Sequence, residues 1–163
     1  VGTNSTIDAE DAVLNSPYYR NFRELFDVAA NNCKFNFDRL DPNYTYLMEL
    51  CSCYNTIVVP YNEPKLFHIG TRNNITCEEV EVDIGIEKPK QYMLSSLDDC
   101  IAMAATFDFT KEGFVVVDKN YHRVKVKSED YVRVHRLANN GSITLERAID
   151  LIRINELEEF LVY

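Results

Sequence analysis

Two segments of the chain alternate apolar with polar residues, and this pattern predicts β-strands. They are Tyr44–Leu50 and Lys65–Arg72. Residues two apart on a strand share a face, so the alternation suits a sheet with one covered side. Between them, Asn55–Tyr61 is rich in β-branched residues and predicts a further strand. The turn-forming residues Asn62-Glu63-Pro64 would then lead the chain into the strand that follows.

Apolar residues at helical spacing predict a first helix over Pro17–Asn31, with Ser16 as its N-cap. A second helix is predicted over Ser95–Phe107, where a serine precedes acidic residues and then apolar ones. A third helix is expected near the end of the sequence, within residues 137–163, after a capping serine or threonine.

An apolar segment followed by a basic one predicts a β-hairpin late in the chain. Its strands would be Phe114–Val117 and Tyr121–Lys127, joined by a three-residue loop in which Asn120 takes the left-handed conformation. Because the first strand is apolar at every position, we expect it to be central in its sheet. The order helix, strands, helix, hairpin, helix predicts an α+β fold of mostly antiparallel sheets flanked by helices.

The composition fits one folded domain or most of one. The chain has 163 residues, 46% of them hydrophobic. No apolar run approaches the roughly 18 residues that a membrane span needs. Its five cysteines include no Cys-x-x-Cys pair, so we expect free, mostly buried thiols in a reducing compartment.

Charge is distributed unevenly along the chain. The net charge is −9, yet residues 111–136 carry seven Lys or Arg against four acids, net +3. Within that band, Arg123, Lys125 and Lys127 would share one face of the predicted strand. Three like charges on one face are tolerated where water or an anion lies among them. Two interpretations stay open here, a solvated hairpin face and a phosphate-binding site.

Two carboxylates could act with these cations. Glu112 stands at the start of the apolar strand, where it could cap, pair with a lysine across the hairpin, or hold a divalent metal beside a phosphate. Glu49 lies among Leu47, Met48 and Leu50. A carboxylate half buried in a strand needs a cation or a hydrogen-bond donor. Glu49 therefore lies either on the wet side of its strand or, with Glu112, beside the lysines around one polar ligand.

Short motifs follow one another along the chain in a characteristic order. They are an acid-bearing strand, an Asn, an apolar segment, a strand that ends in Arg, a Glu-Gly-aromatic-Val element and a Lys-x-Lys strand: Tyr46–Leu50, Asn55, Thr56–Tyr61, Leu66–Arg72, Glu112–Val115 and Lys125–Lys127. In this order and spacing the chain resembles the adenylation domain of phage-type ATP-dependent RNA ligases. These belong to the covalent nucleotidyltransferase superfamily, with DNA ligases and mRNA capping enzymes.

The resemblance implies a function and a set of site residues. Such enzymes use ATP to adenylylate a lysine, pass AMP to an RNA 5′-phosphate, and let the RNA 3′-hydroxyl displace AMP, with Mg²⁺ assisting. By resemblance, Lys125 and Lys127 would contact the α-phosphate. Glu112 would assist metal binding, and Glu49 would lie at the ribose or at a metal-bound water, so that these four would be catalytic. The remaining nucleotide-binding residues would be Val115 and Phe67, packed on adenine, and Arg72.

One element of the family pattern does not occur in the sequence. The family's nucleophilic lysine lies in a Lys-x-Asp-Gly element upstream of the other motifs, and the chain contains no such element. Its opening segment Val1–Ile7 resembles the strand that normally follows, with Asn4 where a basic residue is usual. We therefore expect a domain without its N-terminal nucleophile segment. Such a chain should form no covalent adduct with AMP, because covalent catalysis needs a nucleophile at phosphorus.

These observations lead to three hypotheses about function. The first is a fragment of an RNA ligase, with residues 1–136 as a partial adenylation domain and 137–163 as the lead into a C-terminal part; a first residue that is not Met favours it. The second is a non-catalytic relative that binds nucleotides or RNA ends. The third is a soluble interaction domain. The expected partners are a nucleotide, RNA ends and the missing segment of the same protein, not a membrane. The expected location is the cytoplasm, or the host cytoplasm for a viral protein.

Overall fold

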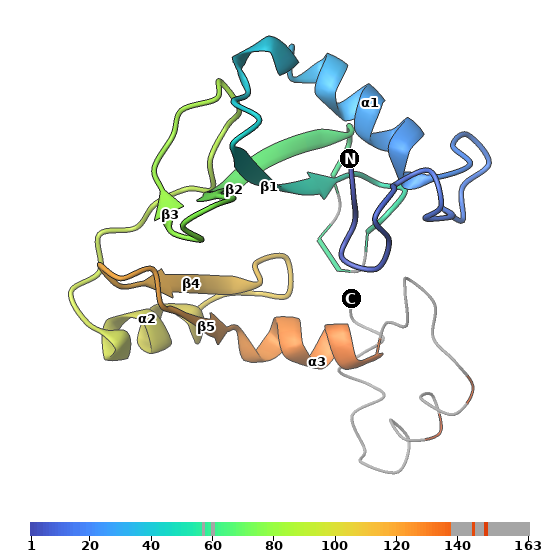
Figure 1. Ribbon diagram of the computed structural model, residues 1–163. Coiled ribbons are helices and arrows are strands. Elements are labelled where there is room, and N and C mark those ends of the chain that lie inside the picture. Colours follow the sequence, from blue (N-terminus) through green and yellow to red (C-terminus); the bar gives the residue numbers. More distant parts are fainter. Residues whose placement is uncertain (57, 60, 138–144, 146–148, 150–163) are drawn as a thin grey trace. The chain divides into compact units, whose positions relative to one another are not determined.

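The chain folds into two compact units of helix and antiparallel sheet (Figure 1). The computed structural model describes residues 1–56, 58–59, 61–137, 145 and 149. Unit 1 comprises Val1–Asn55 and Tyr61–Gln91, and unit 2 comprises the described parts of Thr56–Pro60 and of the chain from Tyr92 onward. The predicted α+β class is confirmed. No helix in these ranges is long and apolar enough to cross a bilayer.

Unit 1 is built on a three-stranded antiparallel sheet, with one helix over one of its faces (Figure 1). The alternating segments form two of the strands, as predicted. Packing of the helix against the inner face buries a common core, in which full burial of a Val- to Phe-sized side chain contributes about 1.5–3 kcal/mol. The elements of this unit are α1 (Phe22–Asn32), a 3₁₀ turn η1 (Phe37–Arg39), β1 (Tyr44–Cys51), β2 (Lys65–Asn73) and β3 (Glu79–Val80).

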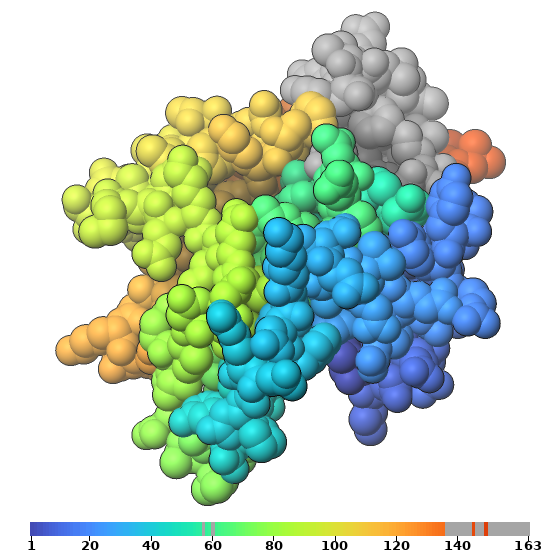
Figure 2. Space-filling model, turned by 90° about the horizontal axis from the view of Figure 1, so that it is seen from above, coloured from blue at the N-terminus to red at the C-terminus, as the bar shows by residue number. Residues whose placement is uncertain are grey.

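Aromatic residues extend this core beyond α1. The ring centroids of Phe26 and Phe37 lie 6.1 Å apart, and those of Phe35 and Phe37 lie 4.7 Å apart. Figure 2 shows the corresponding surface, where the cyan atoms of the η1 segment adjoin the blue atoms of α1. The segment after α1 is therefore held against the helix, although it forms only a single 3₁₀ turn of its own.

Helix α1 begins at Phe22, later than the sequence pattern predicts, because Asn21 caps it. The Asn21 side chain accepts a hydrogen bond from the Glu24 amide at 3.0 Å. The Glu24 carboxylate in turn accepts one from the Arg20 amide at 2.9 Å, so the two side chains satisfy amides at the helix start from both directions. Ser16, the predicted cap, instead closes a turn ahead of the helix.

The predicted strand Asn55–Tyr61 does not form in any of its described residues. Side chains at the end of β1 turn the backbone away from the sheet. The Asn55 side-chain amide nitrogen donates to the Leu50 carbonyl at 2.7 Å, and the Ser52 hydroxyl lies 2.5 Å from the Asn55 side-chain oxygen. Such local side-chain bonds compete with a sheet ladder. The opening segment Val1–Ile7 likewise forms turns and no strand.

Unit 2 is built on a two-stranded hairpin with a short helix packed beside it (Figure 1). The second predicted helix is confirmed with narrower bounds, and Ser96 is its N-cap. The third predicted helix lies outside the described residues except at Leu145 and Ile149, which are both helical. The elements of this unit are α2 (Leu97–Ala104), β4 (Gly113–Val117), β5 (Arg123–Lys127) and α3 (Glu129–Leu137).

Two details of the hairpin differ from the prediction. Within the described residues, β4 pairs with β5 alone, so it is not central; Val115 and Val117 are 55% and 46% exposed. The left-handed residue of the loop is Tyr121, at φ 63°, and not Asn120. The loop has three residues, as predicted, but it lies one position later than predicted, since the Asp118 amide donates to the His122 carbonyl across residues 119–121.

The thiols are free, as predicted, but they are not mostly buried. Cys100 alone of the five is buried, while Cys53 and Cys77 are exposed. Both exposed cysteines lie outside the strands, Cys53 in the turn after β1 and Cys77 in the connection between β2 and β3.

Candidate functional site

The outer face of the β1–β2 pair, turned away from the buried core, brings Glu49 and Phe67 together. The two residues lie directly across from each other in the antiparallel register. Cross-strand partners of this kind project to the same side of a sheet, with Cβ atoms about 5 Å apart. Glu49 is exposed and Phe67 is half-buried. Glu49 is thus on the wet side of its strand, and the residues predicted for the ribose and for adenine are neighbours.

A β-bulge in β2 brings Arg72 to the same outer face. The register shifts between Leu47 and the following residue of β1, and Ile69 is the extra residue on β2. Phe67 and Arg72 are an odd number of positions apart, so unbroken alternation would place them on opposite faces. Beyond the bulge, Arg72 lies across from Thr45, which shares the side of Glu49. All three predicted residues of unit 1 therefore share one face.

Tyr61 adds a second aromatic ring beside Phe67. The two ring centroids lie 6.3 Å apart with planes inclined at 60°, and the Lys65 ammonium lies 4.9 Å from the Phe67 centroid. Burial raises the pKa of the nearby Cys51 thiol, while a hydrogen bond with Tyr61 lowers it by less. The sequence pattern placed Tyr61 at the end of a strand, which concealed its position beside the site.

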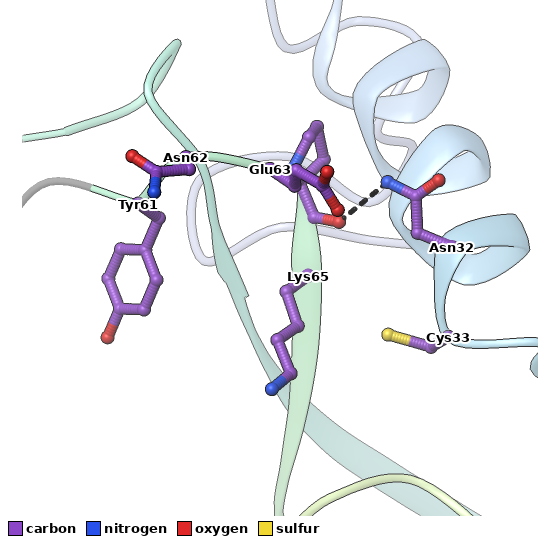
Figure 3. Close-up of a pocket in the computed structure, with 7 residues that line it drawn as sticks. Asn32, Cys33, Tyr61, Asn62, Glu63 and Lys65 are labelled. Atoms are coloured by element: carbon purple, nitrogen blue, oxygen red, sulfur yellow. Dashed lines mark hydrogen bonds between the residues drawn. The ribbon is translucent and has the colours of Figure 1, made fainter.

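A cavity of about 480 Å³ lies beside the start of β2 (Figure 3). It is lined by the loop Tyr61–Lys65 and by Asn32 and Cys33 at the end of α1. The Asn32 side chain donates to the Pro64 carbonyl at 2.9 Å, which ties the loop to the helix. Tyr61 and Lys65 thus belong both to this cavity and to the aromatic contact on the outer face.

In unit 2 the hairpin brings the other predicted residues together. Val115 lies across from Lys125, and Gly113 lies across from Lys127. The Glu112 carboxylate lies 2.8 Å from the Lys127 ammonium, so of the three roles open to Glu112 the ion pair is the one observed. Within the described part of the chain, Lys125 forms no ion pair. It stands on a face that β5 leaves exposed.

The predicted residues therefore fall into two sets. Three lie on the outer face of unit 1, and four lie on the hairpin of unit 2. Their convergence on one adenylate cavity stays a prediction. No cluster of three or more His, Cys, Asp or Glu side chains able to hold a metal ion occurs among the residues that the structure describes.

Comparison with known proteins identifies relatives whose names include RNA ligase. The chain is 36% identical over 129 residues to "Putative bifunctional polynucleotide kinase/RNA ligase" of Autographa californica nuclear polyhedrosis virus, covering 75% of this chain and 18% of the relative. It is 22% identical over 207 aligned positions to "RNA ligase" of Rhodothermus phage RM378, covering 99% of this chain and 47% of the relative. No family model matches the chain. The chain is related in sequence to these RNA ligases and spans less than half the length of either.

Proposed function

We propose that this chain forms part of the adenylation domain of an ATP-dependent RNA ligase, which joins RNA 5′-phosphate and 3′-hydroxyl ends through lysyl-AMP and RNA-adenylate intermediates. The sequence relatives support the ligase assignment. The observation that carries the nucleotide site is the arrangement on the hairpin. Lys125 and Lys127 share one face, with Val115 across from the first and Glu112 paired to the second.

Lys125 and Lys127 are suited to hold one phosphate between them. Two residues apart on a strand, their Cα atoms are separated by roughly 6–7 Å, and both side chains can reach a common anion. Ammonium groups placed there stabilise the negative charge that develops on the phosphoryl oxygens during transfer. Val115, exposed beside Lys125, offers an apolar surface for the nucleobase.

Glu112 is suited to hold Mg²⁺ together with the nucleotide. Protein-bound Mg²⁺ usually keeps several waters and uses one or two carboxylates plus phosphate oxygens. The Glu112–Lys127 pair is partly exposed, at 49% and 34%, and such pairs contribute at most about 1 kcal/mol. Lys127 can therefore turn to the phosphate, and Glu112 to the metal, at small cost. Bound there, Mg²⁺ would neutralise part of the phosphate charge.

On unit 1, the outer face supplies groups for the nucleoside. The Phe67 ring can stack on adenine, and the Glu49 carboxylate can accept hydrogen bonds from ribose hydroxyls. The Arg72 Nε donates to the Cys77 carbonyl at 3.0 Å, which holds the guanidinium on this face. These residues bind and orient the nucleotide. The nucleophilic step of the proposed reaction needs a lysine that these motifs do not supply.

Replacement of each hairpin lysine tests the proposal. In Lys125→Ala and Lys127→Ala, AMP and Mg-ATP measured by titration calorimetry should bind about 10- to 150-fold more weakly, because a charge-assisted hydrogen bond is worth about 1.5–3 kcal/mol. Lys88→Ala makes the same charge change on unit 1, where Lys88 pairs with Glu81, and should leave the affinity unchanged. Wild-type affinity in both hairpin variants would contradict the proposed site.

The radiolabel left on the chain after treatment with labelled ATP and denaturation shows whether this chain binds the nucleotide without a covalent bond or itself supplies the nucleophile. We expect none to be retained, because the motifs described here hold the nucleotide without bonding to it. Retained label would show that a residue of this chain acts as the nucleophile.

A further inference from the structure

Arg123 is not explained by the proposed nucleotide site. It lies across from Val117, on the same face of β5 as Lys125 and Lys127. Four strand steps of about 3.3 Å place its Cα roughly 13 Å from that of Lys127. A phosphate held between Lys125 and Lys127 therefore lies at one end of the cationic row, and Arg123 lies at the other end. An anion that engages the whole row has to extend along the strand.

The loop before Arg123 adds to the same positive region. Residues 118–127 contain the cations Lys119, Arg123, Lys125 and Lys127 and the single acid Asp118, net +3 with His122 neutral, in a chain of net charge −9. All four cations are exposed. A local reversal of charge on an acidic protein attracts an anion to this hairpin and keeps it from the rest of the surface.

The loop is also held in shape, because the carboxylate of its single acid, Asp118, is hydrogen-bonded within the loop. The Asp118 carboxylate accepts hydrogen bonds from the amides of Asn120 and His122, at 2.8 and 2.9 Å, and lies 2.9 Å from the His122 ring nitrogen. The His122 side chain and amide lower the pKa of Asp118. The Arg123 guanidinium donates to the Tyr121 carbonyl at 3.0 Å, which fixes the cation next to an exposed aromatic residue.

We propose that this hairpin tip, defined as Lys119, Tyr121 and Arg123, binds single-stranded RNA beyond the phosphate at the nucleotide site. The inference rests on the proposed function. Proteins that bind single strands combine a positively charged track for the backbone with aromatic rings on which bases stack. Here β5 supplies cations at every second residue, and the tip supplies a ring at the end of the row. A chain of phosphates that continues along β5 from the phosphate between Lys125 and Lys127 meets Arg123 and then the loop.

Two other anions share this chemistry, and the test separates them. The β- and γ-phosphates of ATP carry the same oxygens as an RNA backbone, and an acidic protein carries carboxylates. AMP, ATP, a single-stranded RNA of about 12 nucleotides with a 5′-phosphate, and polyglutamate of similar charge are therefore compared as ligands. The variants are Arg123→Ala, Lys119→Ala with Arg123→Ala, and Tyr121→Ala.

Fluorescence anisotropy of labelled RNA, measured over a series of salt concentrations, gives the result. The logarithm of the wild-type affinity should fall linearly with the logarithm of salt. Arg123→Ala should make this slope shallower by about 0.7, and the double variant by about 1.4. Tyr121→Ala should weaken RNA binding at least about fivefold without changing the slope. AMP affinity should stay within twofold of wild type. Arg20→Ala, the same change at an 89% exposed side chain of unit 1, is the control and should alter neither quantity.

Several outcomes would overturn this inference without touching the nucleotide site. They are an unchanged salt slope in Arg123→Ala, a loss of ATP affinity with AMP and RNA affinity intact, or polyglutamate binding as tight as RNA binding. Failure of the wild-type chain to bind RNA, with AMP binding retained, would do the same. Failure of the wild-type chain to bind AMP would instead contradict the proposed function.

Discussion

Replacing Gly113 with alanine tests whether the hairpin geometry holds Glu112 and Lys127 together. Gly113 has a φ of +134°, a backbone conformation that residues other than glycine rarely adopt, and it lies across from Lys127. An alanine Cβ would lie 2.0 Å from the Val126 carbonyl oxygen and 2.8 Å from the Lys127 Cα. Both are backbone atoms, so the clash is relieved only when β4 moves away from β5.

Two costs add in this variant. Holding a residue with a side chain in this backbone region costs about 1–3 kcal/mol. Forcing an extra methyl group into packed surroundings costs about 1–3 kcal/mol more. We therefore expect the free energy of unfolding to fall by about 2–6 kcal/mol, which is large beside the 5–15 kcal/mol total of a typical domain.

Urea unfolding and native-state hydrogen exchange measure the loss and locate it. Exchange of the β4 and β5 amides should speed up, and AMP affinity should fall because Glu112 and Lys127 separate. Gly85→Ala is the matched control, since Gly85 also has a positive φ, of +79°. There the Cβ would meet only the end of the flexible Arg39 side chain, at 2.9 Å. Its cost should stay near the lower limit of about 1 kcal/mol.

The reasoning would be refuted if the alanine at position 113 changed the unfolding free energy by less than about 0.5 kcal/mol, the range of an ordinary surface substitution. Equal losses in the Gly113 and Gly85 variants would refute the argument from the backbone clash, while leaving the argument from φ intact.

Two further predictions concern the core of unit 1. His68 is 3% exposed, and burial lowers its pKa, so folding favours the neutral ring. The stability that the neutral His68 ring contributes is present above the unfolded pKa of about 6.5 and is lost as the pH falls below that value. The difference in unfolding free energy between about pH 7.5 and pH 5.5, measured by urea titration, should therefore be smaller in His68→Gln than in wild type. Leu66 is 0% exposed, so Leu66→Ala should lower the free energy of unfolding by about 2–5 kcal/mol. Leu47 is 45% exposed, and Leu47→Ala should lower it by less than about 1 kcal/mol. Similar losses in the two variants, measured by urea unfolding, would contradict the argument from burial.

Alternation along the sequence was enough to predict the two long strands, because burial on one face fixes the period. It was not enough at Asn55–Tyr61, where β-branched residues favour a strand but Ser52 and Asn55 bond to the local backbone instead. The start of α1 was misplaced for a similar reason. Ser16 and Asn21 are both good caps by residue type. The structure distinguishes them, since the Glu24 amide donates to Asn21 and the Glu24 carboxylate accepts from the neighbouring Arg20 amide.

For the candidate site, the sequence indicated which residues to expect more readily than it indicated on which face of a strand each residue lies. The spacing of Lys125 and Lys127 fixes their common side, and the structure agrees. The common face of Phe67 and Arg72 depends on one extra residue in β2, which alternation does not reveal. Tyr61 was missed because its contact with Phe67 arises from a loop whose path no periodic pattern records.

The bulge at Ile69 also changes how related sequences have to be compared. A homologue with one residue fewer at this point would pair without the bulge, and its arginine, four positions after the aromatic residue, would still share the face of that residue. A homologue of the same length whose strands paired without the bulge would instead turn its arginine toward the hydrophobic interior. The length between the aromatic residue and the arginine, taken together with the presence of the bulge, would tell which members of such a group still offer a guanidinium to a nucleotide.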